Sequence, residues 1–351
     1  MYFNQSFEID GVLIGAGQPP YIIAEMSANH GNDINQAISI VREAKKAGAH
    51  AIKLQTYRAD TLTLNAKNEH FYIKEGPWKG QYLYDLYEDA SMPWEWTEKL
   101  QAVAKEEGIT LFSSPFDISS VAFLETLNMP AYKIASAELM DLPFVRRVAQ
   151  TKKPIIMSTG FATLSEINAA CNVLIEEGVK DVCILKCTSE YPAPAKKINL
   201  KTIPHMKESF HCPVGLSDHT LGNAVPIASV AFGVSVIEKH FILNRDNKTA
   251  DSFFSATPQE LKILVDSVQT AYEAIGEVTY PIKPMPSQRS LIVIKDIKQG
   301  TLFQEGVNIK SLRPGGGVNP SEIANVINRK AVRDINRGTL LQWNLIGELN
   351  E

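Results

Sequence analysis

Residues 21–56 decide the fold, and they read YIIAEMSANHGNDINQAISIVREAKKAGAHAIKLQT. Two apolar, β-rich runs, YIIAEM and AIKLQT, stand at the two ends of this stretch. Between them the apolar residues keep the spacing of one helix face, at Ala37, Ile38, Val41 and Ala44, and a glycine closes the helix. The stretch therefore predicts a strand, a helix and a second strand in succession.

Six further apolar, β-rich runs follow along the chain: TLFSS, AYKIAS, PIIMSTG, VCILKCT, CPVGLSD and SVIEKHF. Helical patterns separate most of them, and two of these patterns begin at capping boxes, Thr163 with Glu166 and Thr257 with Glu260. Eight such strands with their connections fit a parallel (β/α)8 TIM barrel, an α/β fold of about 250 residues. The alternative, an open doubly wound sheet, usually has about five or six strands. We therefore predict the barrel.

Both ends of the chain carry additional structure. The run FEIDGVLIG near the start alternates around Asp10 and Gly11, which predicts a β-hairpin, so the barrel domain is expected over residues 1–280. The proline-rich stretch GEVTYPIKPMPSQ breaks the pattern and predicts a linker over 281–288. Short strand-like runs and glycine turns then predict a small β-rich domain over 289–351.

The composition excludes several classes of protein. The 351 residues are 44% hydrophobic with a formal net charge of −4, so neither nucleic acid nor an anionic membrane is an expected partner. We expect a cytoplasmic protein, because no apolar run is long enough for a membrane span and MYFNQSFEID lacks the features of a signal peptide. The four cysteines show no paired framework and are expected to be reduced, buried thiols: Cys171, Cys183, Cys187 and Cys212.

In a barrel of this kind the active site forms at the carboxyl ends of the strands. Those ends carry a set of charged and polar residues: Glu25, Lys53, Gln55, Ser113, Lys133, Ser136, Ser158, Lys186, Ser189, Tyr191, Ser217, Asp218, His219, Glu238 and His240. Three of them are lysines, which would repel one another across the barrel mouth unless an anion lies between them. With serine hydroxyls as further donors, the sequence predicts a site for a phosphate or a phosphorylated carboxylate.

His219 and His240 end two successive strands. Neighbouring strands lie about 4.8 Å apart, so the two imidazoles can share one ion. Two nitrogen ligands with open positions suit Mn²⁺, Mg²⁺, Zn²⁺ or Co²⁺. The alternative is that both histidines are structural and bond to neighbouring carboxylates such as Asp218 and Glu238.

The same motifs, taken together, resemble the sialic acid synthase family strand by strand and in the same order: AEMSANHG, AIKLQTY, FSSPFD, AYKIAS, STG, LKCTSEYPAP, GLSDHT and IEKHF. The tail, with DIKQGTLF and KSLRPGGG, resembles that family's C-terminal antifreeze-like (SAF) domain. Within the family, SANH, LYDLYEDASMPWEW and KCTSEYPAP are most similar to the branch that makes pseudaminic acid.

This resemblance implies condensation of phosphoenolpyruvate with a hexosamine aldehyde to give a nine-carbon α-keto acid and phosphate. In the pseudaminic branch the sugar is 2,4-diacetamido-2,4,6-trideoxy-altropyranose. Matching positions assign phosphoenolpyruvate to Lys53, Ser113, Lys133, Ser136, Ser158 and Ser217. They assign the sugar to Gln55, Ser189, Tyr191, Asp251 and Arg313. His219 and His240 would bind Mn²⁺, with Mg²⁺ or Co²⁺ as alternatives.

Three residues are expected to be catalytic: Glu25, Lys53 and Lys133. Glu25 would move the proton of the water that adds to phosphoenolpyruvate, since it is the acid at the exit of the first barrel strand, and the alternative is that the metal activates this water. The resemblance also implies a domain-swapped homodimer in which Arg313 reaches into the partner's barrel.

The run LYDLYEDASMPWEW suits a loop that covers a sugar with a 6-methyl group and a second acetamido group. The alternative is that its aromatic residues, Tyr87, Trp94 and Trp96, pack against the outer helices.

Other functions stay open at this point. The closest alternative is an N-acetylneuraminic or legionaminic acid synthase. A more distant one is an aldolase with Lys133 or Lys186 as its Schiff base. A non-catalytic protein that binds ice or carbohydrate through its tail is the most distant.

Overall fold

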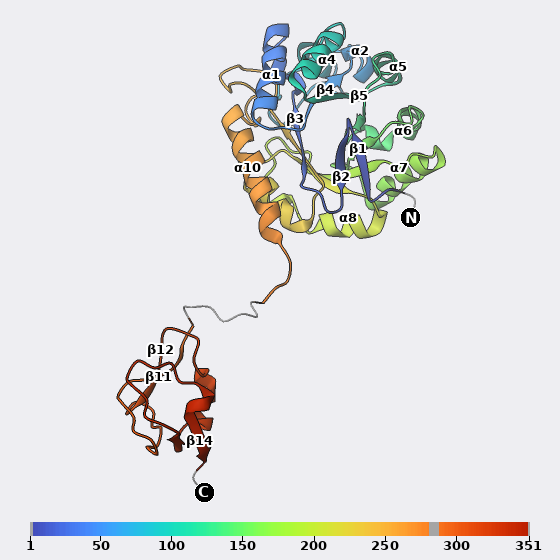
Figure 1. The fold of residues 1–351 in the computed structure, drawn as a ribbon. Helices are drawn as coiled ribbons and strands as arrows, with labels where there is room; N and C mark the ends of the chain where they lie inside the picture. Colours follow the sequence, from blue (N-terminus) through green and yellow to red (C-terminus); the bar gives the residue numbers. More distant parts are fainter. Residues whose placement is uncertain (1–2, 281–287, 350–351) are drawn as a thin grey trace. The chain divides into compact units, whose positions relative to one another are not determined.

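The computed structural model describes residues 3–280 and 288–349, which divide into two compact units, Met1–Gly276 and Glu277–Glu351 (Figure 1). Apart from its last residue, the predicted linker over 281–288 lies outside the described residues. The two units are described separately.

The first unit is built on a closed barrel of eight parallel strands. These are β3 (Tyr21–Glu25), β4 (Ala51–Thr56), β5 (Thr110–Pro115), β6 (Tyr132–Ile134), β7 (Ile155–Ser158), β8 (Val182–Cys187), β9 (Val214–Asp218) and β10 (Val236–His240). The last strand pairs with both β9 and β3, which closes the barrel. This closure confirms the predicted TIM barrel and excludes the open sheet.

Helices surround the barrel (Figure 1). They are α1 (Ile34–Lys46), α2 (Ala59–Leu62), α3 (Leu83–Ala90), α4 (Trp96–Glu107), α5 (Ile118–Thr126), α6 (Leu142–Ala149), α7 (Leu164–Glu176), α8 (Thr202–Phe210), α9 (Ala224–Ser229) and α10 (Pro258–Ile275). The predicted capping boxes are present at the start of α7 and of α10, where Thr163 and Thr257 accept from the backbone N–H groups of Glu166 and Glu260. Local sequence thus sets where these helices begin.

Side chains alternate between the two faces of each barrel strand, and this alternation positions the site. Outward residues such as Ile22 and Ile52 join the large core between barrel and helices. Inward residues such as Ile23 and Phe112 form a small separate core inside the barrel.

The predicted N-terminal hairpin is present as β1 (Ser6–Ile9) and β2 (Val12–Gly15). Asp10 and Gly11 have φ values of +48° and +76°, as a two-residue hairpin turn requires. Phe7, Ile9 and Ile14 pack into the small inner core. Apolar side chains therefore fill the end of the barrel where the strands begin, and the polar residues are left at the end where they finish.

The C-terminal unit is β-rich, as predicted. It contains two antiparallel pairs, β11 (Ser290–Val293) with β12 (Ile309–Leu312), and β13 (Arg329–Ala331) with β14 (Ile346–Leu349). Its own apolar core includes Leu291, Phe303 and Leu341.

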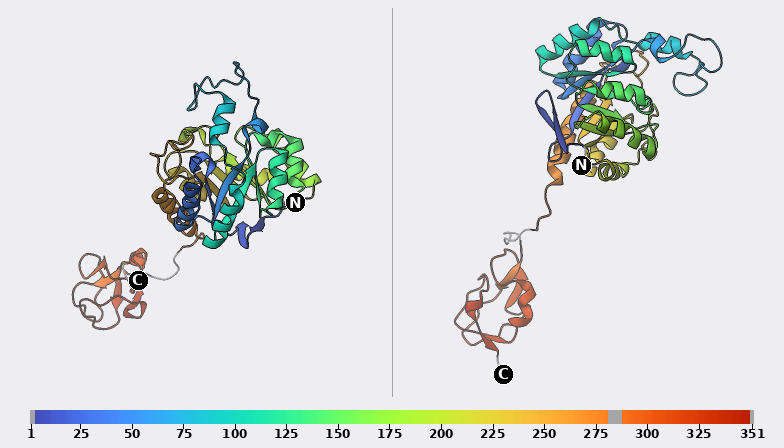
Figure 2. Two further views of the ribbon diagram at one scale, coloured as in Figure 1. Left: turned by 90° about the horizontal axis from the view of Figure 1, so that it is seen from above. Right: turned by 90° about the vertical axis from the view of Figure 1, so that its right-hand side faces the viewer.

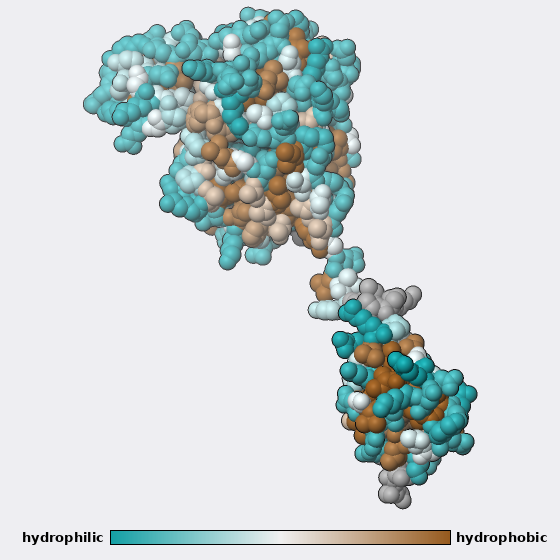
Figure 3. Space-filling view, turned by 90° about the vertical axis from the view of Figure 1, so that its left-hand side faces the viewer, coloured by the Kyte–Doolittle hydropathy of each residue, from teal (hydrophilic) through white to brown (hydrophobic). Residues whose placement is uncertain are grey.

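All four cysteines are buried free thiols, as expected from their sequence context. Hydrophilic residues cover much of the face shown in Figure 3, with hydrophobic residues between them. In residues 3–280 and 288–349, no helix is both long and apolar enough to cross a membrane.

Candidate active site

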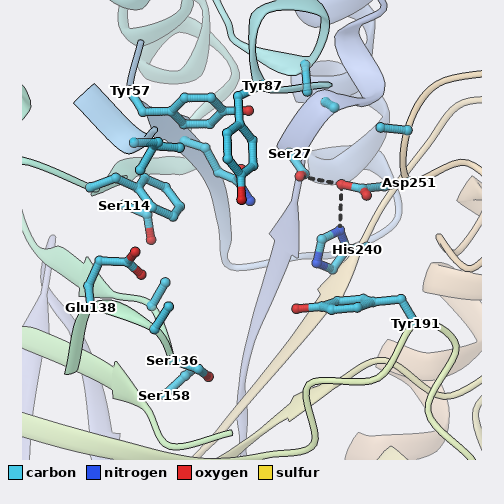
Figure 4. A pocket seen from close by; sticks show the side chains of 18 of the residues that line it. Ser27, Tyr57, Tyr87, Ser114, Ser136, Glu138, Ser158, Tyr191, His240 and Asp251 are labelled. Atoms are coloured by element: carbon cyan, nitrogen blue, oxygen red, sulfur yellow. Dashed lines mark hydrogen bonds and ion pairs between the residues drawn. The ribbon is translucent and has the colours of Figure 1, made fainter. Parts of the chain in front are cut away.

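A cavity of about 440 Å³ opens at the carboxyl end of the barrel. Its lining comes from seven of the eight barrel strands and from the loops that follow them (Figure 4). Most residues predicted from the strand ends line it: Lys53, Gln55, Lys133, Ser136, Ser158, Tyr191, Ser217, His219, Glu238 and His240. Asp251, assigned from the family resemblance, lines it too. The structure thus brings together residues that lie far apart in the sequence.

Two lysines and a glutamate form the floor of this cavity. Lys53 and Lys133 are 3% and 2% exposed, and their Nζ atoms lie 3.7 and 3.9 Å from the Glu238 carboxylate. Burial disfavours the charge of Lys53, but the Glu238 and Glu25 carboxylates outweigh it and raise the pKa of Lys53. For Lys133 burial prevails and lowers the pKa, despite the attraction of Glu238. The two lysines hold the pKa of Glu238 well below its usual range against the opposing effect of burial.

Serine hydroxyls surround this floor. The Ser217 Oγ donates to Glu238 at 3.1 Å, and the Ser136 Oγ accepts from the Gly160 N–H at 3.0 Å. The Ser158 hydroxyl is buried without a hydrogen-bond partner among the described residues. Buried hydroxyls normally have a partner, so Ser158 is available to an anion above the lysines.

Gly160 has a steric reason for its identity. A Cβ atom there would lie 2.0 Å from the Ser189 Oγ and 2.9 Å from the Ser136 Oγ. Only glycine lets the backbone approach these hydroxyls so closely.

The alternation of side chains corrects two predicted placements. Ser113 and Lys186 occupy outward positions of β5 and β8: Ser113 bonds to the Thr56 hydroxyl at 2.7 Å, and Lys186 donates to the Cys187 carbonyl at 2.7 Å. Their neighbours Ser114 and Cys187 line the cavity instead. The predicted cluster of three lysines is therefore a cluster of two.

Glu25 and Ser189 are not among the residues that line the cavity, although both contact residues that are. The Glu25 carboxylate pairs with Lys53 and accepts from the Ser27 N–H at 2.7 Å, and it is absent from the cavity lining. Ser189 packs against Gly160 and is absent from the lining too. The structure therefore places neither residue among those that line the cavity, and it brings Glu25 against Lys53.

The two histidines are neighbours on the cavity lining, where their rings meet edge-on with centroids 5.3 Å apart. The Nδ1 of His219 bonds to the Thr188 carbonyl at 3.0 Å, and the Cys187 thiol is a second neighbour that raises the pKa of His219 against the opposing effect of burial. His240 Nδ1 lies 3.5 Å from the Asp251 carboxylate, whose Oδ2 accepts from the Ser27 hydroxyl at 2.5 Å (Figure 4). Burial raises the pKa of Asp251, but His240 and Ser27 outweigh it and lower that pKa.

The alternative for the two histidines is that they bond to the neighbouring carboxylates of Asp218 and Glu238. Both carboxylates have other partners. Asp218 pairs with Lys239 at 2.5 Å, and Glu238 is engaged by the floor lysines and Ser217. Within the part of the chain that the structure describes, no three His, Cys, Asp or Glu residues are grouped to hold a metal. An ion between the histidines would thus have two imidazole ligands and take the rest from water or substrate.

Sequence reasoning missed Glu138, Tyr57 and Trp78, which all line the cavity. Glu138 points into it from the loop after β6 (Figure 4), and burial raises its pKa to about 7. The signal for Glu138 was its place two residues after Ser136 in AYKIASAE. No such signal marks Trp78, which lies in a long irregular segment between β4 and α3.

The aromatic residues of the run LYDLYEDASMPWEW are predicted either to cover the sugar or to pack against the outer helices, and the structure shows one residue at the cavity and two in packing positions. Tyr87 lines the cavity. Trp94 stacks on Phe123 with centroids 4.9 Å apart, and Trp96 meets His30 edge-on at 5.9 Å. The two tryptophans therefore pack the outside of the barrel.

Arg313 belongs to the C-terminal unit, directly after β12. Its predicted role in a partner's barrel stays a prediction.

Comparison with known proteins gives consistent results over nearly the whole chain. The model of the NeuB family matches residues 40–280, and that of the SAF domain matches 288–346. Pseudaminic acid synthase of Campylobacter jejuni is 45% identical over 92% of this chain and 95% of its own length. Pseudaminic acid synthase of Helicobacter pylori is 40% identical over 92% and 97%. A crystal structure of N-acetylneuraminic acid synthetase from Leptospira borgpetersenii superposes with a TM-score of 0.71 at 29% identity, covering 81% of this chain and 93% of that one.

Proposed function

The chain belongs to the NeuB family, and on this premise we propose that it catalyses the reaction of a pseudaminic acid synthase. Phosphoenolpyruvate condenses with 2,4-diacetamido-2,4,6-trideoxy-altropyranose to give a nine-carbon α-keto acid and phosphate. Two pseudaminic acid synthases share 40–45% of their residues with this chain, against 29% for the N-acetylneuraminic acid synthetase. This difference favours the pseudaminic substrate over that of the neuraminic branch.

The floor of the cavity carries the proposal. Lys53 and Lys133 are almost fully buried beside Glu238, and Ser158 adds an unpartnered hydroxyl. Burying a lysine is costly unless an anion compensates it. The phosphate and carboxylate of phosphoenolpyruvate supply such charges, and the lysines with Ser136, Ser158 and Ser217 would hold them. A site closed off from water strengthens each of these contacts.

The reaction forms one carbon–carbon bond and breaks one carbon–oxygen bond. C3 of phosphoenolpyruvate attacks the aldehyde carbon of the open sugar, whose oxygen takes up a proton. Water then adds at C2, and the tetrahedral intermediate expels phosphate to leave the keto group. The floor lysines stabilise the negative charge of the phosphate as it leaves.

Glu138 is the best-placed residue to accept the proton of the attacking water. It lines the cavity, and its pKa of about 7 lets it exchange a proton near neutral pH. Glu25, the residue expected from the sequence, is shielded behind Lys53 and would instead orient that lysine.

The donor set fits a divalent cation such as Mn²⁺, held by His219 and His240. The supporting observation is that both imidazoles line the cavity with their ring centroids 5.3 Å apart, and that the Thr188 carbonyl fixes the Nδ1 side of His219. When bound, the ion would polarise the sugar aldehyde. Asp251 would orient His240 through its carboxylate, which is a different role from the sugar contact expected from the sequence.

We further propose a homodimer in which Arg313 of one chain reaches the sugar site of the other. The family match of the C-terminal unit to the SAF domain supports this arrangement. We also propose a cytoplasmic location, because phosphoenolpyruvate is available there.

The decisive experiment offers phosphoenolpyruvate with one of three sugars and measures phosphate release. We expect the highest kcat/KM with the altrose substrate, and lower values with N-acetylmannosamine and the legionaminic precursor. A preference for N-acetylmannosamine would contradict the substrate but not the reaction.

One observation favours a second mechanism, since a buried lysine with a lowered pKa is suited to Schiff-base chemistry. Trapping of pyruvate on Lys133 by borohydride, without phosphate release, would establish the aldolase instead.

A further inference from the structure

The cavity changes character from floor to mouth. Its floor is charged, whereas the segment between β4 and α4 contributes a wall of mainly apolar side chains, termed here the apolar wall: Leu62, Ile73, Trp78, Leu83, Leu86 and Tyr87. This segment extends from the side of the barrel opposite to the N-terminal hairpin (Figure 2). In Figure 4, Tyr57 and Tyr87 lie at the other end of the view from Ser136 and Ser158.

Trp78 stands at the tip of a small hairpin within this segment. Backbone hydrogen bonds from Ile73 N to Gln81 O and from Leu83 N to Phe71 O, at 2.9 and 2.8 Å, hold the hairpin together. The two strand-like segments of the hairpin are thus hydrogen-bonded to each other on both sides of the tip. Trp78 therefore belongs to a hydrogen-bonded hairpin.

The indole of Trp78 joins this hairpin to the opposite side of the cavity. Its Nε1–H donates to the Ala250 carbonyl at 3.0 Å, and its ring packs on Tyr191 with centroids 5.5 Å apart. The one polar group of the indole is therefore already satisfied. A substrate group that meets Trp78 meets an apolar surface.

A second cavity of about 480 Å³ lies beyond Trp78. It shares five lining residues with the first cavity, and its own lining includes polar residues such as Asn32, Gln81 and Lys248; the shared residues are Ala28, Trp78, Leu86, Ala90 and Ala250. Trp78 is the largest side chain of the boundary between the two cavities.

Under the proposed function, C1 of the sugar reacts above the floor lysines, so C6 is the carbon farthest from the reaction. We propose that the apolar wall, with Trp78 at its centre, selects sugars that carry a methyl group rather than a hydroxymethyl group at C6. Of the six side chains of the wall, only Tyr87 and Trp78 carry a polar group, and the Trp78 N–H is already bonded, so a hydroxyl beside Trp78 would lose its hydrogen bonds to water and gain little in return. Apolar pockets disfavour an added hydroxyl by about 100-fold at most, so we expect a preference of about 10- to 100-fold.

The inference rests on the proposed function, and two sugars that differ only at C6 test it. They are 2,4-diacetamido-2,4,6-trideoxy-altropyranose and its analogue with a hydroxyl group at C6. The ratio of their kcat/KM values is measured by phosphate release in the wild-type protein and in Trp78→Ala. The variant joins the two cavities, so the preference should fall about tenfold or more while the KM for phosphoenolpyruvate stays the same.

Three further variants complete the design. Trp78→Phe keeps an aromatic ring and should retain most of the preference. Ile73→Ala removes another part of the wall and gives a second reading if Trp78→Ala does not fold. Leu64→Ala changes a 66%-exposed residue of the same segment that lies outside the cavity, and it should behave as wild type.

The possible failures are distinguishable. An unchanged preference in Trp78→Ala and Ile73→Ala, or equal use of both sugars by the wild-type protein, would overturn the selection by the apolar wall. Absence of phosphate release with either sugar in the wild-type protein would overturn the proposed function and this inference with it.

Discussion

The same two strands, β9 and β10, carry buried charges on both of their faces, and the two faces differ. On the outward face Lys239 donates to Asp218 at 2.5 Å and to the Thr220 carbonyl at 2.8 Å. The other Asp218 oxygen accepts from the Thr220 hydroxyl and N–H. This outward pair is complete.

The inward set is incomplete. Glu238 lies 3.7 and 3.9 Å from the two floor lysines, and one of its oxygens has no hydrogen-bond partner among the described residues. The Ser158 hydroxyl also lacks a hydrogen-bond partner among the described residues. The same kinds of buried charged group thus serve two purposes. The outward charges, which have all their hydrogen-bond partners, stabilise the barrel, and the inward groups that lack partners are available to a ligand. Five substitutions test this difference.

Breaking the outward pair should have the largest effect, and on stability alone. Lys239→Met leaves Asp218 buried without its partner, which costs about 3–5 kcal/mol. Denaturant unfolding of the barrel unit measures this loss. The KM for phosphoenolpyruvate should be unchanged in the fraction that stays folded, and a large rise would assign Lys239 to the site.

The matching inward change should act on activity and spare stability. Lys133→Met removes charge-assisted hydrogen bonds to the substrate, each worth about 1.5–3 kcal/mol, so kcat/KM for phosphoenolpyruvate should fall about 1,000-fold. The melting temperature should stay the same or rise, because burial of this lysine is unfavourable and Lys53 still compensates Glu238. Normal affinity for phosphoenolpyruvate would remove Lys133 from the anion site.

Glu138→Gln should lower kcat by about 100-fold, the lower end of the range for a general base. The pH profile gives the sharper reading. A base with a pKa of about 7 is protonated and inactive below that pH, so kcat/KM should rise tenfold per pH unit and level off above 7. In Glu138→Gln the rise of kcat/KM with pH below 7 should be absent. If the rise is retained, the titrating group is a residue other than Glu138.

Ser158→Ala should have the smallest effect, a rise of about tenfold in the KM for phosphoenolpyruvate, because one hydrogen bond is lost. Thr220→Val is the matched change on the outward face, where the hydroxyl is already bonded to Asp218. It should lower stability by about 1 kcal/mol and leave that KM unaltered. If Thr220→Val raised the KM for phosphoenolpyruvate and Ser158→Ala lowered only stability, unpartnered hydroxyls would not mark the binding site.

The sequence predicted the barrel and most of the site because both follow from local order along the chain. Strand ends meet at one face of a barrel, so Lys53, Lys133 and His240 could be grouped without knowing any distance. The hairpin turn at Asp10 and Gly11 and the capping boxes are equally local.

The predictions that the structure does not support concern whether a strand side chain points into the barrel or out toward the helices. Ser113 and Lys186 stand one position away from residues that do line the cavity, and a shift of one residue reverses the face of a strand. Sequence alone does not give the phase of that alternation when both faces are buried. Glu25 has the correct face, but the Lys53 ammonium covers it.

The sequence by itself determined the eight strands, their order and the kinds of charge at the barrel mouth, because hydrophobic periodicity and helix ends depend on residues close together in the chain. Only the tertiary structure decided which charges are paired and which are free, that Glu138 has a pKa near 7, and that Trp78 lies against Ala250. Several of these contacts join residues more than a hundred positions apart, such as Lys53 with Glu238 and Trp78 with Ala250, and they arise when the barrel closes.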